Sequence, residues 1–366
     1  SSNFNMKLYN RKAVTNKYSR TKVIEKLAHE KGDCVSIAEL FEKMMMKCLD
    51  NRALNIDIFR KPQHGGDREI YVLGFEERVV QRVIEQVARM ICSFVPEETM
   101  THPQNKVAIP ENTFREARGV YRGQHVTLNS SADASKWSQN NCSFKLLLPL
   151  LIMSPKYLHK TIIRCLKLWE FKKILINPQI LELFDQHKDL LLHDKTLQCM
   201  YNGYRGIEKH RWIKVGRPYI DLTTGMMQGI LHYSSSLYHS AIIARVKQIV
   251  NDSRNQILNV LGYKKSFKIV MCHLQSSDDS FFSVSSPLDG SAELSRRSRI
   301  LATSILQFKV DLSSEMGVVN SIKTVLNSNH VFEFNSNFEF GFNHYKPDIK
   351  AVFSGFLVSE QELLLT

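Results

Sequence analysis

Hydrophobic residues recur at the spacing of an amphipathic helix in three long segments of the chain. The first, Ser36–Leu49, begins with a serine that can cap a helix, and it places five apolar residues on one face: Leu40, Phe41, Met44, Met45 and Cys48. The second, Glu76–Phe94, carries a longer apolar stripe: Val79, Val80, Val83, Ile84, Val87, Ala88 and Ile91. The third runs from Ile230 to about Val250. These segments predict three helices that pack against a core.

Shorter apolar runs predict strands. One is expected at Ile70–Leu73, and another, Gln124–Leu128, leads toward Asp133. Two further runs, Phe267–Leu274 and Phe281–Val284, are separated by polar residues with the turn expected at Gln275, Ser276 and Ser277. Apolar runs of this length on either side of a short polar turn predict a β-hairpin.

The remaining segments are less regular. The middle of the chain, from Phe144 to about Leu191, is expected to be helical, and Arg211–Thr223 alternates as a strand does. Lys61–Ile70 and His102–Phe114 contain Pro or paired Gly and are expected to be loops. Residues 1–31 are basic and lack clear periodicity.

Composition narrows the class of protein. The chain has 366 residues and 43% hydrophobic content, enough for a large core and more than one subdomain. Its seven cysteines are scattered and never form a Cys-x-x-Cys pair, which argues against a disulfide framework and for a reducing compartment. No apolar run reaches the roughly 18 residues that a membrane span requires. Because the chain begins Ser1-Ser2-Asn3, we expect it to be a piece of a longer polypeptide.

The charge favours a polyanionic partner. The formal net charge is +13, and neutralised phosphates dominate non-specific binding of nucleic acids. In the middle segment, aromatic Trp169 and Phe171 accompany six basic residues: Lys156, Lys160, Arg164, Lys167, Lys172 and Lys173. Two interpretations stay open for this segment, a solvated helix face and a wall that faces an RNA template.

Two adjacent carboxylates, Asp278 and Asp279, follow Ser277 at the tip of the expected hairpin. Such a pair is often part of an ordinary solvated turn, but the charges repel each other unless a cation binds. Asp133 supplies a third carboxylate near the end of a strand and is followed by Lys136 and Trp137. Carboxylates from separate strands that bracket two divalent cations are the requirement of two-metal phosphoryl transfer.

Three further segments carry candidate binding residues, each with an ordinary structural interpretation beside it. Gly225-Met226-Met227-Gln228-Gly229 precedes a helix and either approaches a ligand closely or simply starts the helix. Lys61, Gln63 and Arg68 either contact a triphosphate or are solvated. Near the end of the chain, Lys323 precedes the acidic Glu333 in an aromatic, alternating segment.

The order of these segments resembles the RNA-dependent RNA polymerase of segmented negative-strand RNA viruses, the bunyavirus L protein, and most closely its phlebovirus-like branch. The resemblance rests on literal strings: Lys61-Pro62-Gln63-His64-Gly65-Gly66 with Arg68-Glu69-Ile70-Tyr71-Val72, then Gly225-Met226-Met227-Gln228-Gly229-Ile230-Leu231-His232, and Glu333-Phe334-Asn335-Ser336. It spans about Lys61 to Lys350. Ser-Asp-Asp together with Glu-x-x-Ser favours an RNA-templated enzyme over a reverse transcriptase.

The resemblance implies roles for these residues. Asp133, Asp278, Asp279 and Glu333 would be metal ligands, and Lys323 a proton donor to pyrophosphate. Nucleotide or RNA would be contacted by eight residues: Lys61, Gln63, Arg68, Lys136, Trp137, Gln228, Gly229 and Ser277.

The implied fold is α+β, a right-hand polymerase core of fingers and palm with an antiparallel palm sheet and the start of a thumb at the C-terminus. The expected divisions are fingers at 1–130 with a fingertip motif at 61–78, palm motif A at 131–145, a helical fingers insertion at 146–214, palm motifs B to E at 215–345, and thumb from 346 to 366.

The implied activity is RNA-templated RNA synthesis from ribonucleoside triphosphates, with Mg²⁺ or Mn²⁺ as cofactor. RNA template and product, and the viral nucleoprotein, would be partners. The expected location is the host cell cytoplasm, with association to the virion. The alternative is a non-catalytic RNA-binding relic of an integrated viral polymerase.

Overall fold

The computed structural model describes the following residues: 25, 27–29, 32, 36–51, 53–63, 66–227, 229–263, 266–288, 291–329, 331–335, 337–340 and 343–345. For 59–63, 66–69, 331–332, 337–340 and 343–345, only the backbone is described. The chain divides into two compact units, and each is made of two separate stretches of sequence. The first unit contains 1–87 and 141–231, and the second contains 88–140 and 232–366. The expected division into fingers, palm and thumb stays a prediction.

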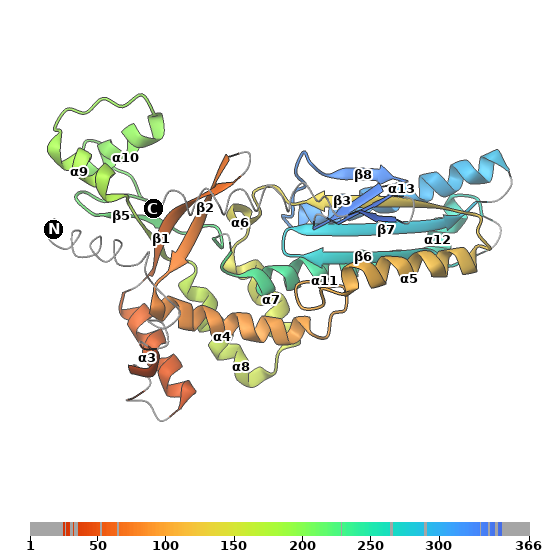
Figure 1. The fold of residues 1–366 in the computed structure, drawn as a ribbon, viewed down its shortest axis with the longest axis horizontal. Coiled ribbons are helices and arrows are strands. Elements are labelled where there is room, and N and C mark those ends of the chain that lie inside the picture. Colours follow the sequence, from red (N-terminus) through yellow and green to blue (C-terminus); the bar gives the residue numbers. More distant parts are fainter. Residues whose placement is uncertain are drawn as a thin grey trace. The chain divides into compact units, whose positions relative to one another are not determined.

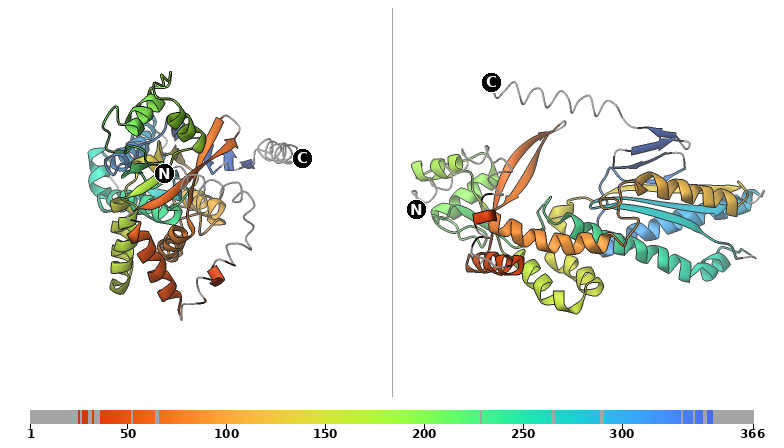
Figure 2. Two further views of the ribbon diagram at one scale, coloured as in Figure 1. Left: turned by 90° about the vertical axis from the view of Figure 1, so that its left-hand side faces the viewer. Right: turned by 60° about the horizontal axis from the view of Figure 1, so that its bottom comes forward.

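The first unit contains a four-stranded mixed sheet with the order β2-β1-β4-β5. β1 and β2 form an antiparallel hairpin, which Figure 2 shows as a two-stranded ribbon, while β1 and β4 pair in parallel. The elements of this unit are α3 (Ile37–Asp50), β1 (Leu54–Gln63), β2 (Gly66–Leu73), α7 (Ser143–Met153), α8 (Lys156–Leu168), β4 (Lys172–Leu175), α9 (Pro178–Gln186), α10 (Lys195–Arg205) and β5 (Tyr219–Leu222). α4 (Phe75–Cys92) begins in this unit and ends in the second.

The second unit is built around a four-stranded antiparallel sheet with the order β6-β7-β3-β8 (Figure 1). Its strands β9 to β11 form a separate three-stranded antiparallel sheet. The elements of this unit are α5 (Asn105–Val120), β3 (His125–Asp133), α6 (Trp137–Asn140), α11 (His232–Asp252), α12 (Arg254–Val260), β6 (Val270–Ser276), β7 (Asp279–Pro287), α13 (Ala292–Glu315), β8 (Val325–Ser328), β9 (Val331–Phe334), β10 (Asn337–Phe340) and β11 (Asn343–Tyr345). Together the two units confirm the α+β class, and both sheets of the second unit are antiparallel.

Helices cover both faces of the sheet in the second unit. Strand alternation sends Phe282 to one face, where it packs with Ile243 of α11 and Ile305 of α13. Phe281 points to the other face and packs with Phe114 of α5. The sheet is therefore packed on both sides.

Several local expectations are confirmed. α3 starts after Ser36, whose hydroxyl accepts a hydrogen bond from the backbone N–H of Glu39, and all five of its predicted apolar residues are buried. In α4, four residues of the predicted stripe are buried (Val80, Ile84, Ala88 and Ile91), and the other three are half-buried. The third predicted helix is α11, and β6 and β7 form the predicted hairpin.

Other local expectations are wrong. The segment Lys61–Ile70 is largely strand, because β1 and β2 continue to within two residues of each other. His102–Phe114 is mostly helix: α5 runs through Pro110, which is buried, and its apolar face packs on β6. The helical middle is interrupted by the short strand β4, and only the end of Arg211–Thr223 is a strand. The 346–366 segment and Gln228 lie outside the described residues.

Candidate active site in the second unit

Three carboxylates meet at one end of the antiparallel sheet. Asp133 is the last residue of β3, and Asp279 is the first residue of β7. The two are direct partners in the β3–β7 register, and Asp278 stands next to them in the turn between β6 and β7. The backbone carbonyl of Asp278 accepts a hydrogen bond of 3.3 Å from the N–H of Ala134. Sheet register thus brings together residues that are about 145 positions apart in sequence.

The local electrostatics are those of crowded negative charge. Burial, together with the neighbouring Asp278, Asp133 and Glu333, raises the pKa of Asp279 to about 7, while Lys106 of α5 opposes the rise. A carboxyl group in such surroundings is costly to ionise unless a cation is near. Near neutral pH this carboxyl is therefore divided between its protonated and its ionised form.

Glu333 and Lys323 lie beside this cluster. Glu333 is exposed, but its backbone N–H donates to the hydroxyl of Ser131 on β3, two residues before Asp133. Lys323 is also exposed, and its N–H donates to the hydroxyl of Ser321. That same hydroxyl contacts a carboxylate oxygen of Asp133 at 3.3 Å. Because Glu333 helps to raise the pKa of Asp279, the carboxylate of Glu333 lies within electrostatic reach of Asp279.

The β6–β7 turn rests on a layer of buried polar side chains, which we call the layer beneath the turn: Trp137, Ser235, Ser236 and His239. Ser277 has a positive φ of 53°, in the left-handed region that favours glycine. Its hydroxyl lies 3.2 Å from the indole nitrogen of Trp137 and 3.3 Å from the hydroxyl of Ser235. The carbonyl of Ser277 is 3.0 Å from Nδ1 of His239, and its N–H donates to the hydroxyl of Ser236. These contacts fix the backbone that presents both aspartates.

Two buried side chains brace this layer. The amide nitrogen of Gln275 donates to the carbonyls of Ser277 and Asp279, at 3.1 and 2.8 Å. Glu98 is fully buried, and its carboxylate accepts hydrogen bonds from the hydroxyl of Ser236 and from the backbone N–H groups of Met100 and Thr101. The turn is therefore supported both by its direct contacts and by a second set of hydrogen bonds behind them.

Sequence patterns did not reveal four residues of this neighbourhood. Lys106 of α5 lies within electrostatic reach of Asp279, and His239 belongs to the layer beneath the turn, which Glu98 braces. Lys309 of α13 is 1% exposed, and its ammonium donates to the hydroxyl of Ser280, the residue after Asp279. Burial lowers the pKa of Lys309 to about 8. For Lys309 the sequence offers one signal, a charged residue on the apolar face of a helix. The positions of Lys106, Glu98 and His239 near the carboxylates depend on contacts between distant segments, which no local pattern shows.

The remaining predicted site residues have different positions. Lys136 is exposed, at the start of the turn into α6, and has a positive φ of 49°. Lys61 and Arg68 are directly paired across the β1–β2 hairpin of the first unit, and Gln63 ends β1. Gly229 also belongs to the first unit, is exposed and has a φ of +84°.

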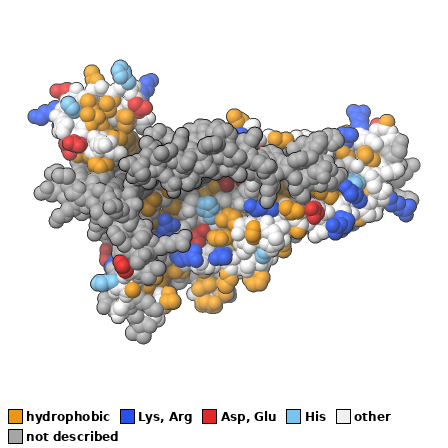
Figure 3. Space-filling view, viewed as in Figure 1, with side chains coloured by type: hydrophobic (Ala, Val, Ile, Leu, Met, Phe, Trp, Pro, Cys, Tyr) orange, Lys and Arg blue, Asp and Glu red, His pale blue; other side chains and the backbone are white. Residues whose placement is uncertain are grey.

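The basic middle segment is divided by the structure. Lys156, Lys160 and Lys167 are exposed on α8, but Arg164 pairs with Glu42 at 2.8 Å. Lys172 is 1% exposed and donates to the carbonyl of Trp169, so it belongs neither to a solvated face nor to an RNA-facing wall. The face drawn in Figure 3 carries Lys and Arg side chains in several separate places, among hydrophobic and acidic ones.

Comparison with known proteins decides the family. The family model described as bunyavirus RNA dependent RNA polymerase matches residues 2–365. The chain belongs to this family. It is 36% identical to RNA-directed RNA polymerase L of Rice stripe virus (isolate T), over 95% of this chain and 12% of that protein.

Two other relatives give the same picture. RNA-directed RNA polymerase L of Uukuniemi virus (strain S23) is 36% identical and that of Rift valley fever virus (strain ZH-548 M12) is 34% identical, each over 100% of this chain and 17% of the relative. The chain thus spans between about an eighth and a sixth of the length of these relatives. Among the described residues, no helix combines the length and the apolar character that a membrane crossing demands.

Proposed function

We propose that the chain carries the catalytic centre for RNA-templated RNA synthesis in a viral polymerase. The observation that supports this most directly is the register of β3 and β7, which sets Asp133 opposite Asp279 with Asp278 beside them. Two carboxylates on neighbouring strands and a third in the adjoining turn suit a site for divalent cations. The family membership of the chain favours nucleotidyl transfer over other two-metal reactions.

The donor set fits hard divalent cations. Carboxylate oxygens are the ligands that Mg²⁺ and Mn²⁺ prefer. The crowding that raises the pKa of Asp279 to about 7 would be relieved by a bound cation. When bound, such cations would lower the pKa of the attacking 3′ hydroxyl and neutralise the triphosphate. Asp133, Asp278 and Asp279 would hold them, and Glu333 would add negative charge at the edge of the site.

The residues around the carboxylates would bind and orient substrates. Lys323 would donate a proton to the leaving pyrophosphate, for which its exposed position is suitable. Lys136 would contact a phosphate, while Trp137 and Ser277 maintain the shape of the site through their hydrogen bond. In this proposal the second unit contributes the palm.

The first unit would contribute fingers. Lys61, Gln63 and Arg68 on the β1–β2 hairpin would contact nucleotide phosphates and template, and Gln228 with Gly229 would help to place the template base. The exposed lysines of α8 would add to the attraction for RNA. The thumb expected from residue 346 onward lies outside the described residues. The wider proposal includes the viral nucleoprotein as a partner and action in the host cell cytoplasm and in the virion.

Primer extension by the complete polymerase that contains this chain tests the proposal. The enzyme should extend an RNA primer on an RNA template when Mg²⁺ or Mn²⁺ is supplied. Asp278→Ala should lower extension by at least about a thousandfold, because the carboxylate places cations that stabilise developing charge. RNA affinity should change little, because positive residues elsewhere bind the phosphates. The double variant with Asp133→Ala should be no slower than either single variant, since both residues serve one cluster.

A matched variant separates a chemical effect from a general loss of structure. Asp189 is exposed in the loop after α9, and Asp189→Ala should leave extension within about twofold of wild type. If the wild-type polymerase binds RNA but extends no primer with either metal, RNA synthesis is the wrong function for this chain. The non-catalytic RNA-binding relic would then be the better description.

A further inference from the structure

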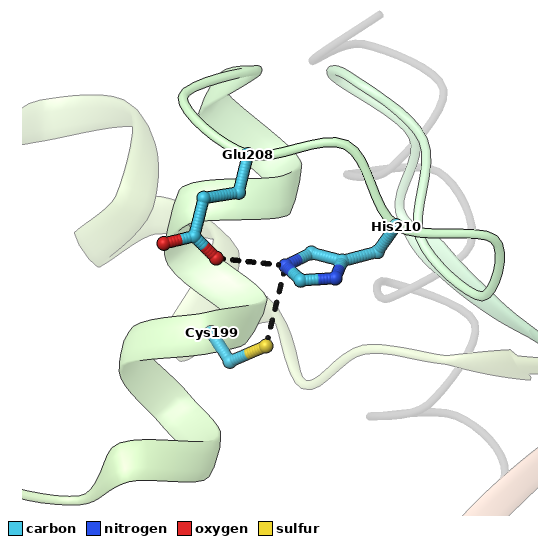
Figure 4. Close-up of side chains that lie close together, drawn as sticks. All are labelled: Cys199, Glu208 and His210. Atoms are coloured by element: carbon cyan, nitrogen blue, oxygen red, sulfur yellow. Dashed lines mark hydrogen bonds and ion pairs between the residues drawn. The ribbon is translucent and has the colours of Figure 1, made fainter.

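The side chains of a cysteine, a glutamate and a histidine lie close together in the first unit (Figure 4). The carboxylate cluster belongs to the second unit. Cys199 lies on α10, and Glu208 and His210 lie on the loop that follows this helix. Nε2 of His210 is 3.3 Å from Sγ of Cys199 and 3.1 Å from Oε2 of Glu208. Three different ligand atoms thus point at one small volume.

The loop is built to return to the helix. Gly206 ends α10 with a left-handed φ of +78°, and the N–H groups of Ile207 and Glu208 both donate to the carbonyl of Asn202. Gly203 permits the close approach, because a Cβ there would lie 2.9 Å from Cδ2 of His210 and 2.3 Å from Cγ2 of Ile213. Backbone geometry and packing therefore hold the three side chains together.

Outer contacts orient two of the ligands. The second carboxylate oxygen of Glu208 accepts a hydrogen bond of 3.0 Å from the amide of Asn202. The ring of His210 stacks on Trp212 with centroids 5.3 Å apart, and the carbonyl of Trp212 accepts a hydrogen bond from Asp221 on β5. Residues that hold metal ligands in place in this way are a regular part of metal sites.

We propose that Cys199, Glu208 and His210 bind a Zn²⁺ ion. Sulfur, imidazole nitrogen and carboxylate oxygen form a donor set that suits Zn²⁺, whereas Mg²⁺ prefers oxygen alone. In a tetrahedral zinc site the ligand atoms are about 3.3–3.7 Å apart, as follows from bond lengths of about 2.0–2.3 Å. The two contacts of His210, 3.3 and 3.1 Å, need to open by only a few tenths of an ångström, and all three ligand atoms lie within 4.8 Å of one another.

Hydrogen bonding alone explains the cluster less well. A ring nitrogen carries either one proton or one lone pair, so Nε2 of His210 cannot form two linear hydrogen bonds, one with the thiol and one with the carboxylate. A cation that binds all three atoms satisfies them together. With three protein ligands, the fourth position of the ion takes water. The ion ties the last turn of α10 to the loop that leads to β5.

Cobalt substitution and thiol protection test this site in the 366-residue chain. Co²⁺ should produce a thiolate-to-metal charge-transfer band in the near ultraviolet, and one equivalent of Zn²⁺ should remove it. Carboxylates of the second unit give no such band, because they carry no sulfur. Zn²⁺ should also slow alkylation of Cys199 by iodoacetamide at least about tenfold, as peptide mapping measures, while exposed Cys142 in the same unit serves as the internal control.

Variants assign the ligands. Cys199→Ser and His210→Gln should each abolish the cobalt band, Asn202→Ala should weaken Zn²⁺ binding by roughly 10–100-fold, and Cys142→Ser should change neither measurement. The proposal is overturned if wild-type chain gives no thiolate band, or if Zn²⁺ protects Cys199 no better than Cys142. Because the alkylation test uses wild-type chain alone, it decides the question even if a variant fails to fold. Neither result depends on RNA synthesis.

Discussion

Removal of the charge at Asp279 should make the metal-free chain more stable, although it removes a proposed metal ligand. The pKa of Asp279 rises from its ordinary value of 3.8 to about 7 through burial and the carboxylates around it. A rise of that size corresponds to roughly 4 kcal/mol that folding loses when the group ionises. Asp279 is partly accessible to water, which screens the charges, so we expect roughly 1–2 kcal/mol in practice.

The sign of the pH dependence follows from the direction of the shift. A carboxyl whose pKa is raised in the folded state contributes stability below its ordinary pKa, and this contribution is lost as the pH rises toward about 7. Asp279→Asn lacks this titration. In metal-free buffer the variant should therefore be more stable than wild type by roughly 1–2 kcal/mol at pH 8, and the difference should shrink as the pH falls toward 4.

Urea unfolding of the 366-residue chain in the presence of a chelator measures this difference. Asp311→Asn makes the same chemical change on the exposed face of α13, where Gln307 can still donate to residue 311, and it should stay within about 0.5 kcal/mol of wild type. Saturating Mg²⁺ or Mn²⁺ should reverse the order, because a ligand at a hundred times its Kd stabilises wild type by about 2.7 kcal/mol. A metal-free Asp279→Asn chain that is less stable than wild type at pH 8 would refute the electrostatic reasoning.

Three further outcomes are expected. Phe184 is fully buried in the core of the first unit, so Phe184→Ala should lower the free energy of unfolding by about 3–5 kcal/mol, whereas Phe171→Ala at a half-exposed position should cost much less. Burial lowers the pKa of Lys309 to about 8, so the folded state binds this proton less readily than the unfolded state. In chemical unfolding, wild type should therefore gain stability relative to Lys309→Met as the pH rises from 8 to 10. The stability difference between wild type and Lys167→Met, at an exposed position, should not change over this pH range. The logarithm of the RNA affinity should fall linearly with the logarithm of the salt concentration, with a slope of roughly −0.7 per neutralised phosphate on single strands. Filter binding should show a shallower slope when three exposed lysines of α8 are replaced: Lys156, Lys160 and Lys167.

Sequence patterns predicted best where one element decides its own structure. The apolar face of α3 and its cap at Ser36 are local features, and both are confirmed. The β6–β7 hairpin was also predicted, although its turn lies at Ser277 and Asp278 and not at 275–277. The apolar runs on both sides determine the pairing, but the position of the turn depends on the buried contacts that hold Ser277 in a left-handed conformation.

The sequence was a poorer guide where distant partners determine the structure. α5 continues through Pro110 because the buried face that carries this proline packs on β6 through Phe114 and Ala117, about 160 residues before that strand in the sequence. β4 is a strand because β1 and β5 pair with it on either side, and no local pattern in 172–175 distinguishes it from the surrounding helices. Lys172 was expected to be solvated or to face RNA, but it is buried in β4 between β1 and β5. Its ammonium donates a hydrogen bond to the carbonyl of Trp169. The carboxylates could be named from the sequence, whereas the layer beneath them could not.

The conformation of Ser277 limits which amino acids related chains can carry at this position. Its positive φ disfavours β-branched residues, so Thr and Val should be rare there, and Gly would relieve the backbone strain. Gly, however, would leave the indole nitrogen of Trp137 and the hydroxyl of Ser235 without the oxygen that now lies between them. A change to Gly at 277 should therefore be accompanied by changes at 137 or 235 in the same lineage. The turn would then be inherited as a set of co-varying positions, and not as one residue.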